Sequence, residues 1–175
     1  SRRRHTRYIS VTGVQTCALP IWGFDLPVLH YRCLVHGLCA ARYWDMGEDD
    51  REFRFNNYIN RYHTRHLDLM DLLAMFQPRA YAPLDEMAKL CGFPGKLGMD
   101  GSEVWNAWQQ GGIGQIRAYC ETDVANTYLM YLRAQCLRGA LERDRYAAEC
   151  ELLRATLSRS GEPHWREFLD AWPPT

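Results

Sequence analysis

The sequence predicts a helix-rich domain with at most one or two β-strands, because helix start and stop signals recur along most of it. Its 175 residues are 47% hydrophobic and 24% charged, an ordinary composition for one soluble domain. No stretch approaches the roughly 20 apolar residues of a membrane-spanning helix. We therefore expect a soluble protein that has its own core and no membrane partner.

The first 21 residues, SRRRHTRYISVTGVQTCALPI, have neither a helical nor a strand period. They carry four arginines and no acidic residue, and they lack the continuous apolar core of a signal peptide. The run resembles a translated sequencing-adapter read, a contaminant of metagenomic assemblies. We expect residues 1–21 to be non-native and unstructured, with a natural basic arm that binds nucleic acid as the alternative.

Six helices are predicted after this run. The first begins at Asp25, has Pro27 in its first turn and ends at Gly37. The second, LDEMAKLC, lies between Pro83 and Gly92 and has acidic residues in its first turn. A glycine-rich loop, GFPGKLGMDG, follows it. The remaining helices are predicted over residues 102–110, 113–141, 142–159 and 164–171.

The segment between the first two helices is less regular. Residues 48–54 are charged and predicted to form a loop. Arg65–Leu69 is predicted as a short strand that runs into a turn or helix. Because a lone strand is not stable in water, its partners must lie elsewhere or be missing from this sequence.

The cysteines and arginines indicate little about function. Seven cysteines are widely spread, odd in number and without a Cys-x-x-Cys pair, so we expect neither a disulfide framework nor a zinc knuckle. A reducing cytoplasm is the simplest compartment for such a chain. Arginine outnumbers lysine 19 to 2, which fits either phosphate recognition or a genome rich in G and C.

One carboxylate falls on the inward face of the predicted helix 113–141. At 100° per residue, Asp123 lies within about 20° of Ile116 and Ala134. Tyr119 is one turn earlier on the same face, so the phenol and the carboxylate can meet at one spot. An unpaired buried carboxylate is costly. The pair therefore forms either a functional site or a salt-bridged structural aspartate beside a core tyrosine.

Four segments, GFDLPVL, RHLDLMDLL, GFPGKLGMDGSEVW and YCETDVANTYLMYLR, in that order, resemble the predicted 3′–5′ exonucleases related to the exonuclease domain of family B DNA polymerases. The resemblance covers about residues 23–139. It implies the DEDDy group and an α/β, ribonuclease-H-like exonuclease fold. The group's second motif ends in Phe-Asp, matched by Asp25, which is otherwise an ordinary helix cap. The third motif, Tyr-x-x-x-Asp, is matched by Tyr119 and Asp123.

The group's first motif, Asp-x-Glu on the first strand, has no counterpart at the expected place. We expect it upstream of Gly23, together with the first strands of the sheet. Residues 22–141 would then be the C-terminal part of the exonuclease domain, and residues 142–175 a helical tail. The chain as given is expected to be mostly helical and inactive.

The resemblance implies phosphodiester hydrolysis with two Mg²⁺ or Mn²⁺ ions, about 3.5–4 Å apart, that stabilise the attacking and leaving oxygens. Asp25 and Asp123 would supply two of the four carboxylates, which are ligands that these ions prefer. Tyr119 would orient the attacking water, because a phenol stays protonated at neutral pH. The implied partner is single-stranded DNA or a DNA 3′ end. The alternative is a non-catalytic helical nucleic-acid-binding or scaffold module in which both aspartates are structural.

Three other polar residues are weaker candidates. Lys96, in the glycine-rich loop, either contacts a DNA phosphate or lies in a solvated turn. Asp68 and Asp71 either support the metal ligands indirectly or cap a helix, and the helix cap is the favoured interpretation.

Two further pairs have a suggestive spacing. His63 and His66 could bind a metal, but no cluster of cysteine or histidine completes the site, so a structural role is favoured. Trp105 and Trp108 are three residues apart on a predicted helix, which is more typical of a core face than of a platform for stacked bases.

Overall fold

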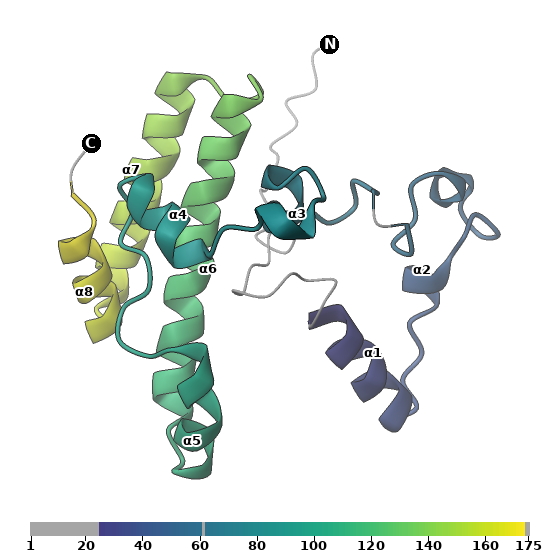
Figure 1. Ribbon diagram of the computed structural model, residues 1–175, viewed down its shortest axis with the longest axis horizontal. Coiled ribbons are helices and arrows are strands. Elements are labelled where there is room, and N and C mark those ends of the chain that lie inside the picture. Colours follow the sequence, from purple (N-terminus) through teal and green to yellow (C-terminus); the bar gives the residue numbers. More distant parts are fainter. Residues whose placement is uncertain (1–24, 61, 174–175) are drawn as a thin grey trace.

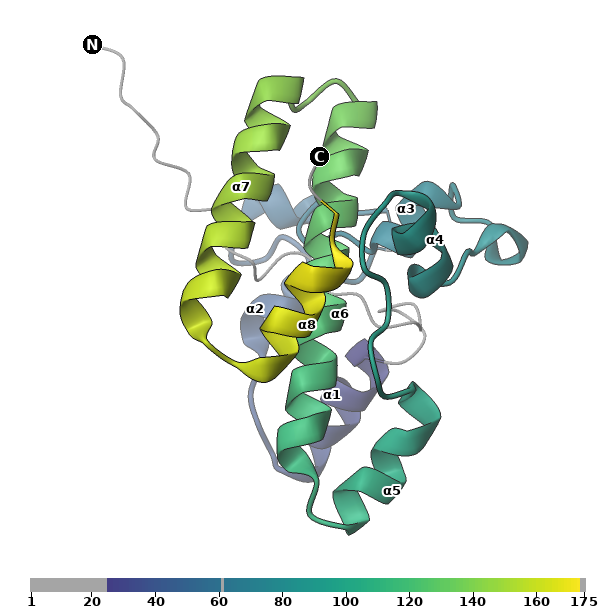
Figure 2. The same cartoon turned by 90° about the vertical axis from the view of Figure 1, so that its left-hand side faces the viewer.

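The computed structural model describes residues 25–60 and 62–173, and in these ranges it is helical with no β-strand. Helix α6 (Ile113–Leu137) is the longest element, and α7 (Arg143–Ser160) runs back beside it (Figure 1). Helix α8 (Pro163–Ala171) packs against both of them (Figure 2). The predicted mostly helical character of the chain is confirmed.

Shorter helices precede this pair. Helices α3, α4 and α5 contact α6, whereas α1 has no buried residue and lies with α2 to one side of the α6–α7 pair (Figure 1). Three short 3-10 helices lie between them. The bounds are α1 (Asp25–Val35), α2 (Ala41–Trp44), η2 (Arg51–Arg54), α3 (Leu69–Leu73), η3 (Pro78–Ala80), α4 (Leu84–Leu90), η4 (Gly101–Glu103) and α5 (Val104–Gln109).

Most predicted helices are present, with differences at their ends. The predicted helix 113–141 ends at Leu137, because Gly139 adopts a left-handed φ of 71° and Ala140 N donates to Gln135 O at 2.9 Å. The predicted helix 102–110 is divided into η4 and α5. The predicted loop 48–54 contains η2, and the prediction for residues 1–21 lies outside the described residues.

The predicted strand at Arg65–Leu69 is wrong for the described chain. Leu67 alone has an isolated bridge, and α3 already begins at Leu69. The reason is a helix cap, because an Asp68 carboxylate oxygen accepts a hydrogen bond from Asp71 N at 3.0 Å. This bond stabilises the first turn of α3 at the place where a strand would have to continue.

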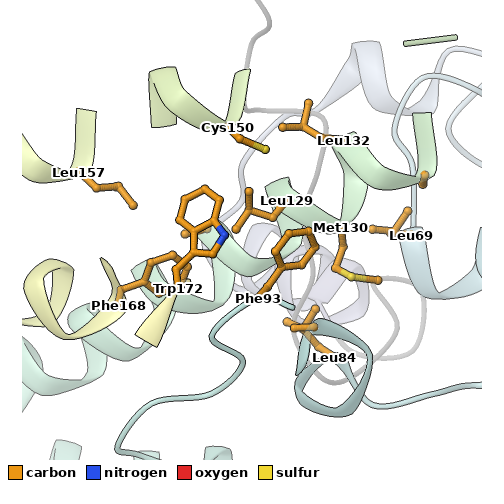
Figure 3. Packing of buried hydrophobic residues seen from close by; sticks show 13 residues of the cluster. Leu69, Leu84, Phe93, Leu129, Met130, Leu132, Cys150, Leu157, Phe168 and Trp172 are labelled. Carbon is orange, nitrogen blue, oxygen red and sulfur yellow. The ribbon is translucent and has the colours of Figure 1, made fainter. Parts of the chain in front are cut away.

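The core lies where α6, α7 and α8 meet α4 and the loop after it. Leu129 and Phe168 are fully buried, next to Phe93 and Trp172 (Figure 3). The guanidinium of Arg154 lies 3.7 Å from the centre of the Trp172 ring and donates to Trp172 O at 3.0 Å. These contacts hold the end of α8 against α7. None of the described helices has the length and apolar character needed to cross a membrane.

Candidate functional site

The most unusual buried group of the described chain is Asp123 on α6. It is 2% exposed, and neither of its carboxylate oxygens has a hydrogen-bond partner of ordinary geometry. Burial raises the pKa of Asp123 above its usual value. Two neighbours oppose this rise: the Tyr119 hydroxyl, through a weak hydrogen-bonding interaction, and the positive charge of Lys96. The charges of Asp85 and Asp100 raise the pKa further. A buried carboxylate without full partners is typical of a functional site.

This raised pKa predicts how Asp123→Asn changes stability with pH in the metal-free chain. The folded chain binds a proton at Asp123 more readily than the unfolded chain, so wild-type stability falls as the pH rises from 3.8 through the raised folded value. The asparagine variant lacks this loss. Its thermal unfolding midpoint should exceed that of the wild type at pH 7, and the gap should close below pH 3.8. A variant less stable than wild type at pH 7 would contradict the prediction.

The glycine-rich loop is attached to α6 by one buried amide. The Asn126 side chain, 1% exposed, accepts a hydrogen bond from Gly95 N at 3.0 Å and donates to Gly95 O at 2.7 Å. The same amide nitrogen also donates to Thr122 O at 3.1 Å. Both backbone groups of Gly95 are therefore satisfied by a single side chain, and the loop is held at a fixed place beside Asp123.

Helix α4 holds the loop from its other side. One Asp85 oxygen accepts from Lys96 N at 2.6 Å, and the other accepts from Lys89 Nζ at 2.8 Å. Gly95 has a left-handed φ of 72°, and a Cβ there would lie 2.5 Å from Asp85 Oδ1. Only glycine fits this position, because any larger residue would be strained and would collide with a carboxylate that is fixed on both sides.

Gly95→Ala should therefore lower the free energy of unfolding by roughly 2–4 kcal/mol, the sum of backbone strain and collision. Gly98→Ala is the matched control, because Gly98 also has a left-handed φ, 77°, but nothing lies within 4 Å of its added Cβ. Strain alone predicts a loss of about 1 kcal/mol there. Urea unfolding of both variants measures the difference, and equal losses would show that the contact with Asp85 is unimportant.

The loop places Lys96 beside the predicted catalytic pair. Its side chain is 20% exposed, and Nζ lies 5.7 Å from the centre of the Tyr119 ring and 3.6 Å from an Asp100 carboxylate oxygen. A Cβ on Gly101 would lie 3.5 Å from the Tyr119 hydroxyl, so the end of the loop also approaches this tyrosine. The structure thus brings together Tyr119, Asp123 and Lys96.

The surroundings of Asp25 differ from those of Asp123. It is the first residue of α1, and its Oδ2 is buried without a hydrogen-bond partner in the described chain. Burial raises its pKa, and the charge of Asp68 raises it further. No hydrogen bond or charge interaction links Asp25 to Asp123 among the described residues. The structure therefore places Asp25 near Asp68.

The carboxylates of Asp123 and Asp25 are of the chemical type that binds a divalent cation, but they are too few to form a complete site. The unpartnered oxygens of Asp123 and Asp25 are hard ligands of the kind that Mg²⁺ and Mn²⁺ prefer. Within residues 25–60 and 62–173, however, no three side chains of His, Cys, Asp or Glu are grouped so that they could hold a metal ion. Asp123 could contribute one ligand, and further carboxylates would be needed to complete a site.

Comparison with known families shows to which family the chain belongs. A family model described as a predicted 3′–5′ exonuclease related to the exonuclease domain of PolB matches residues 9–172. The chain belongs to this family. The match includes α1 through α8 and so extends past the residues 23–139 inferred from the motifs; it begins inside the adapter-like run. No curated protein and no solved structure matches the chain.

This member of the exonuclease family has one Asp-x-Glu tripeptide, Asp50-Arg51-Glu52. It lies at the start of η2 rather than on a strand, where the first motif of the group is expected. One oxygen of Asp50 accepts from Arg42 at 2.8 Å, and the other accepts from Glu52 N at 3.0 Å. Asp50 is therefore engaged in a cap and an ion pair.

The weaker candidates are engaged in structural contacts. Asp68 caps α3, and Asp71, on its first turn, accepts a hydrogen bond from the Tyr81 hydroxyl. The rings of His63 and His66 meet edge to face, 4.1 Å between centres. Burial, aided by the charges of His66 and Arg65, lowers the pKa of His63 to about 4, so this ring is neutral near pH 7.

The core prediction for Trp105 and Trp108 is wrong. The two rings stack on each other, 5.1 Å between centres, but they are 62% and 54% exposed. Spacing of three residues placed them on one face of α5, and this face is exposed. Sequence reasoning also missed Asn126, whose only signal was its position one turn after the buried Thr122.

Proposed function

We propose that the protein is a metal-dependent 3′–5′ exonuclease of the DEDDy, ribonuclease-H-like type, acting on single-stranded DNA or a DNA 3′ end in the cytoplasm. The observation that carries the proposal is Asp123, a buried carboxylate without full partners, one helical turn after Tyr119. This arrangement is the Tyr-x-x-x-Asp motif of the family to which the chain belongs. The cysteines of the described ranges are unpaired thiols, which supports a reducing compartment.

Each residue of the group has a distinct role in this proposal. Asp123 and Asp25 would each contribute a ligand to Mg²⁺ or Mn²⁺, which when bound would supply Lewis-acid stabilisation of the phosphate. Tyr119 orients the attacking water through its hydroxyl, and the Lys96 ammonium attracts a phosphate of the strand as a point charge. Because burial raises the pKa of Asp123, protons compete with a cation for this carboxylate up to a higher pH, and cation binding strengthens as the pH rises.

The 175-residue chain should itself be inactive, since two of the four carboxylates of this mechanism have no counterpart in it. We expect no metal-dependent release of nucleotides from 3′-labelled single-stranded DNA in Mg²⁺ or Mn²⁺. The measurement is gel electrophoresis of labelled products, with EDTA as the metal-free reference. Robust release that EDTA abolishes would show that the 175 residues already form a complete site.

The positive test uses a longer form that carries an Asp-x-Glu strand upstream of Gly23. It should shorten 5′-labelled single-stranded DNA stepwise from the 3′ end when Mg²⁺ is present. An equivalent RNA strand and a blunt duplex define the substrate. If none of the three substrates is cleaved, the proposed function is overturned.

A non-catalytic nucleic-acid-binding or scaffold module is the second candidate, favoured by the lack of a three-ligand metal group in the described chain. In such a module, Asp123 would be a structural residue with no metal to bind. Calorimetric titration with Mg²⁺ separates the two candidates in the longer form. The exonuclease requires that Asp123→Asn weaken Mg²⁺ binding, whereas the module requires no change.

A further inference from the structure

Helices α6, α7 and α8, which contact one another (Figure 2), border a cavity of about 590 Å³. Neither Tyr119 nor Asp123 lines this cavity. Along α7 the lining extends from Glu149 to Ser160, about 16 Å at 1.5 Å per residue. The cavity therefore has the volume of a site for a small organic molecule and an elongated shape.

The stretch between the two ends of the cavity is lined mainly by apolar side chains. These are Val124 and Ala125 on α6 and Leu152, Leu153 and Leu157 on α7. Val124 is 40% exposed and Leu152 is 59% exposed, so part of this lining is open to water. Because covering such side chains removes apolar surface from water, the middle of the cavity favours the hydrocarbon part of a ligand.

Each end of the cavity combines an aromatic ring with a carboxylate. At one end, a Glu149 oxygen accepts a hydrogen bond from the Tyr128 hydroxyl at 3.0 Å, and the other Glu149 oxygen accepts none from the described residues. At the other end lie Trp165 and Glu162, and the side chain of Glu162 forms no cap on α8. A carboxylate together with an aromatic ring is a typical site for an ammonium group.

The charges of the lining also favour a cation. Arg117 is the one lysine or arginine among the described residues that line the cavity, and its Nε donates to Glu121 at 2.6 Å. This bond and the charge of Glu121 raise the pKa of Arg117, and the charge of Glu162 adds to the rise. Arg117 and Glu121 thus balance each other. The negative charges of Glu149 and Glu162, one at each end, remain for a ligand.

We propose that this cavity binds a linear aliphatic polyamine, an organic cation with ammonium groups at both ends of a hydrocarbon chain. One ammonium group lies beside Glu149 and Tyr128, and the other lies beside Glu162 and Trp165. The methylene groups between them cover the apolar side chains of α6 and α7. The site uses none of the residues of the proposed exonuclease mechanism, so it does not depend on that function.

The test measures binding of spermine, a long aliphatic polyamine, to the 175-residue chain in EDTA by calorimetry. Glu149→Gln and Glu162→Gln should each weaken binding roughly 3- to 10-fold, because each variant loses one charge pair with the ligand. Glu151→Gln is the matched control, since Glu151 is also on α7, has a 70% exposed side chain and does not line the cavity. It should leave the affinity unchanged.

Leu152→Asn tests the apolar part of the cavity without changing the charge of the protein. It should weaken spermine binding about 3-fold, because the methylene groups lose an apolar partner. Leu152 is 59% exposed, so the variant should stay folded. Circular dichroism checks the fold of all four variants, and light scattering gives the number of chains in the particle.

Three results would overturn the polyamine site. The first is the absence of saturable spermine binding. The second is equal weakening by Glu151→Gln, or an unchanged affinity in Leu152→Asn, because either would show attraction by the overall surface charge alone. The third is a dimer that Leu152→Asn converts to a monomer, which would show that a second copy of the chain covers the cavity. None of these results bears on the nuclease assay.

Discussion

Under the proposed function, Asp123→Asn should lower the single-turnover rate of a form that carries an Asp-x-Glu strand by more than about 10³-fold at saturating Mg²⁺. The substitution keeps the size of the side chain but removes the charge that would hold a cation. Tyr119→Phe removes only one hydroxyl that orients water, so its loss should be smaller, on the order of 10²-fold. Both variants should remain folded, because Asn and Phe fit the same face of α6.

The assay uses 3′-labelled single-stranded DNA, with the fold checked by circular dichroism. Asp144→Asn is the matched control, since Asp144 is an exposed carboxylate in the first turn of α7 and should leave the rate unchanged. If Asp123→Asn retains a near-wild-type rate, Asp123 is not a metal ligand. If it unfolds the protein while Tyr119→Phe is silent, Asp123 is structural and the assignment of α6 to the site fails.

Local signals predicted the helices well. Pro83 and Gly92 lie just outside α4, and the break at Gly161 and Pro163 separates α7 from α8, as their backbone preferences require. Periodicity alone placed Asp123 on the buried face of α6, and the 2% exposure confirms it. These features depend on residues within a few positions of one another, so the sequence carries them directly.

Features that depend on distant partners could not be predicted in this way. The apolar pattern near Leu67 indicated a strand, but a strand needs a neighbour, and in the described chain the local cap by Asp68 determines the structure instead. Spacing showed that Trp105 and Trp108 share a face without showing what that face contacts. The attachment of Gly95 to Asn126 joins residues 31 positions apart, which no local pattern reveals.

That attachment should make Asn126→Ala one of the most destabilising substitutions in the described chain. Truncation leaves the N–H and the carbonyl of Gly95 without their partner, and each buried group without a partner costs about 1–3 kcal/mol. Asn126 is also 1% exposed, so water cannot easily replace the amide. We expect the free energy of unfolding to fall by roughly 2–4 kcal/mol, with the loop that carries Lys96 released from α6.

Urea unfolding of the 175-residue chain measures the loss, and hydrogen exchange at Gly95 N reports the loop itself. Asn126→Asp is the informative companion, because the aspartate can still accept from Gly95 N but places an oxygen against Gly95 O, where the amide nitrogen now lies 2.7 Å away. Near pH 7, Asn126→Asp should lower the free energy of unfolding at least as much as Asn126→Ala. Part of this stability should return at acidic pH, where the new carboxyl is protonated and can donate to Gly95 O. Gln109→Ala, an exposed residue on α5, should change stability by less than about 0.5 kcal/mol. A similarly small loss for Asn126→Ala would mean that the loop is held mainly by Asp85.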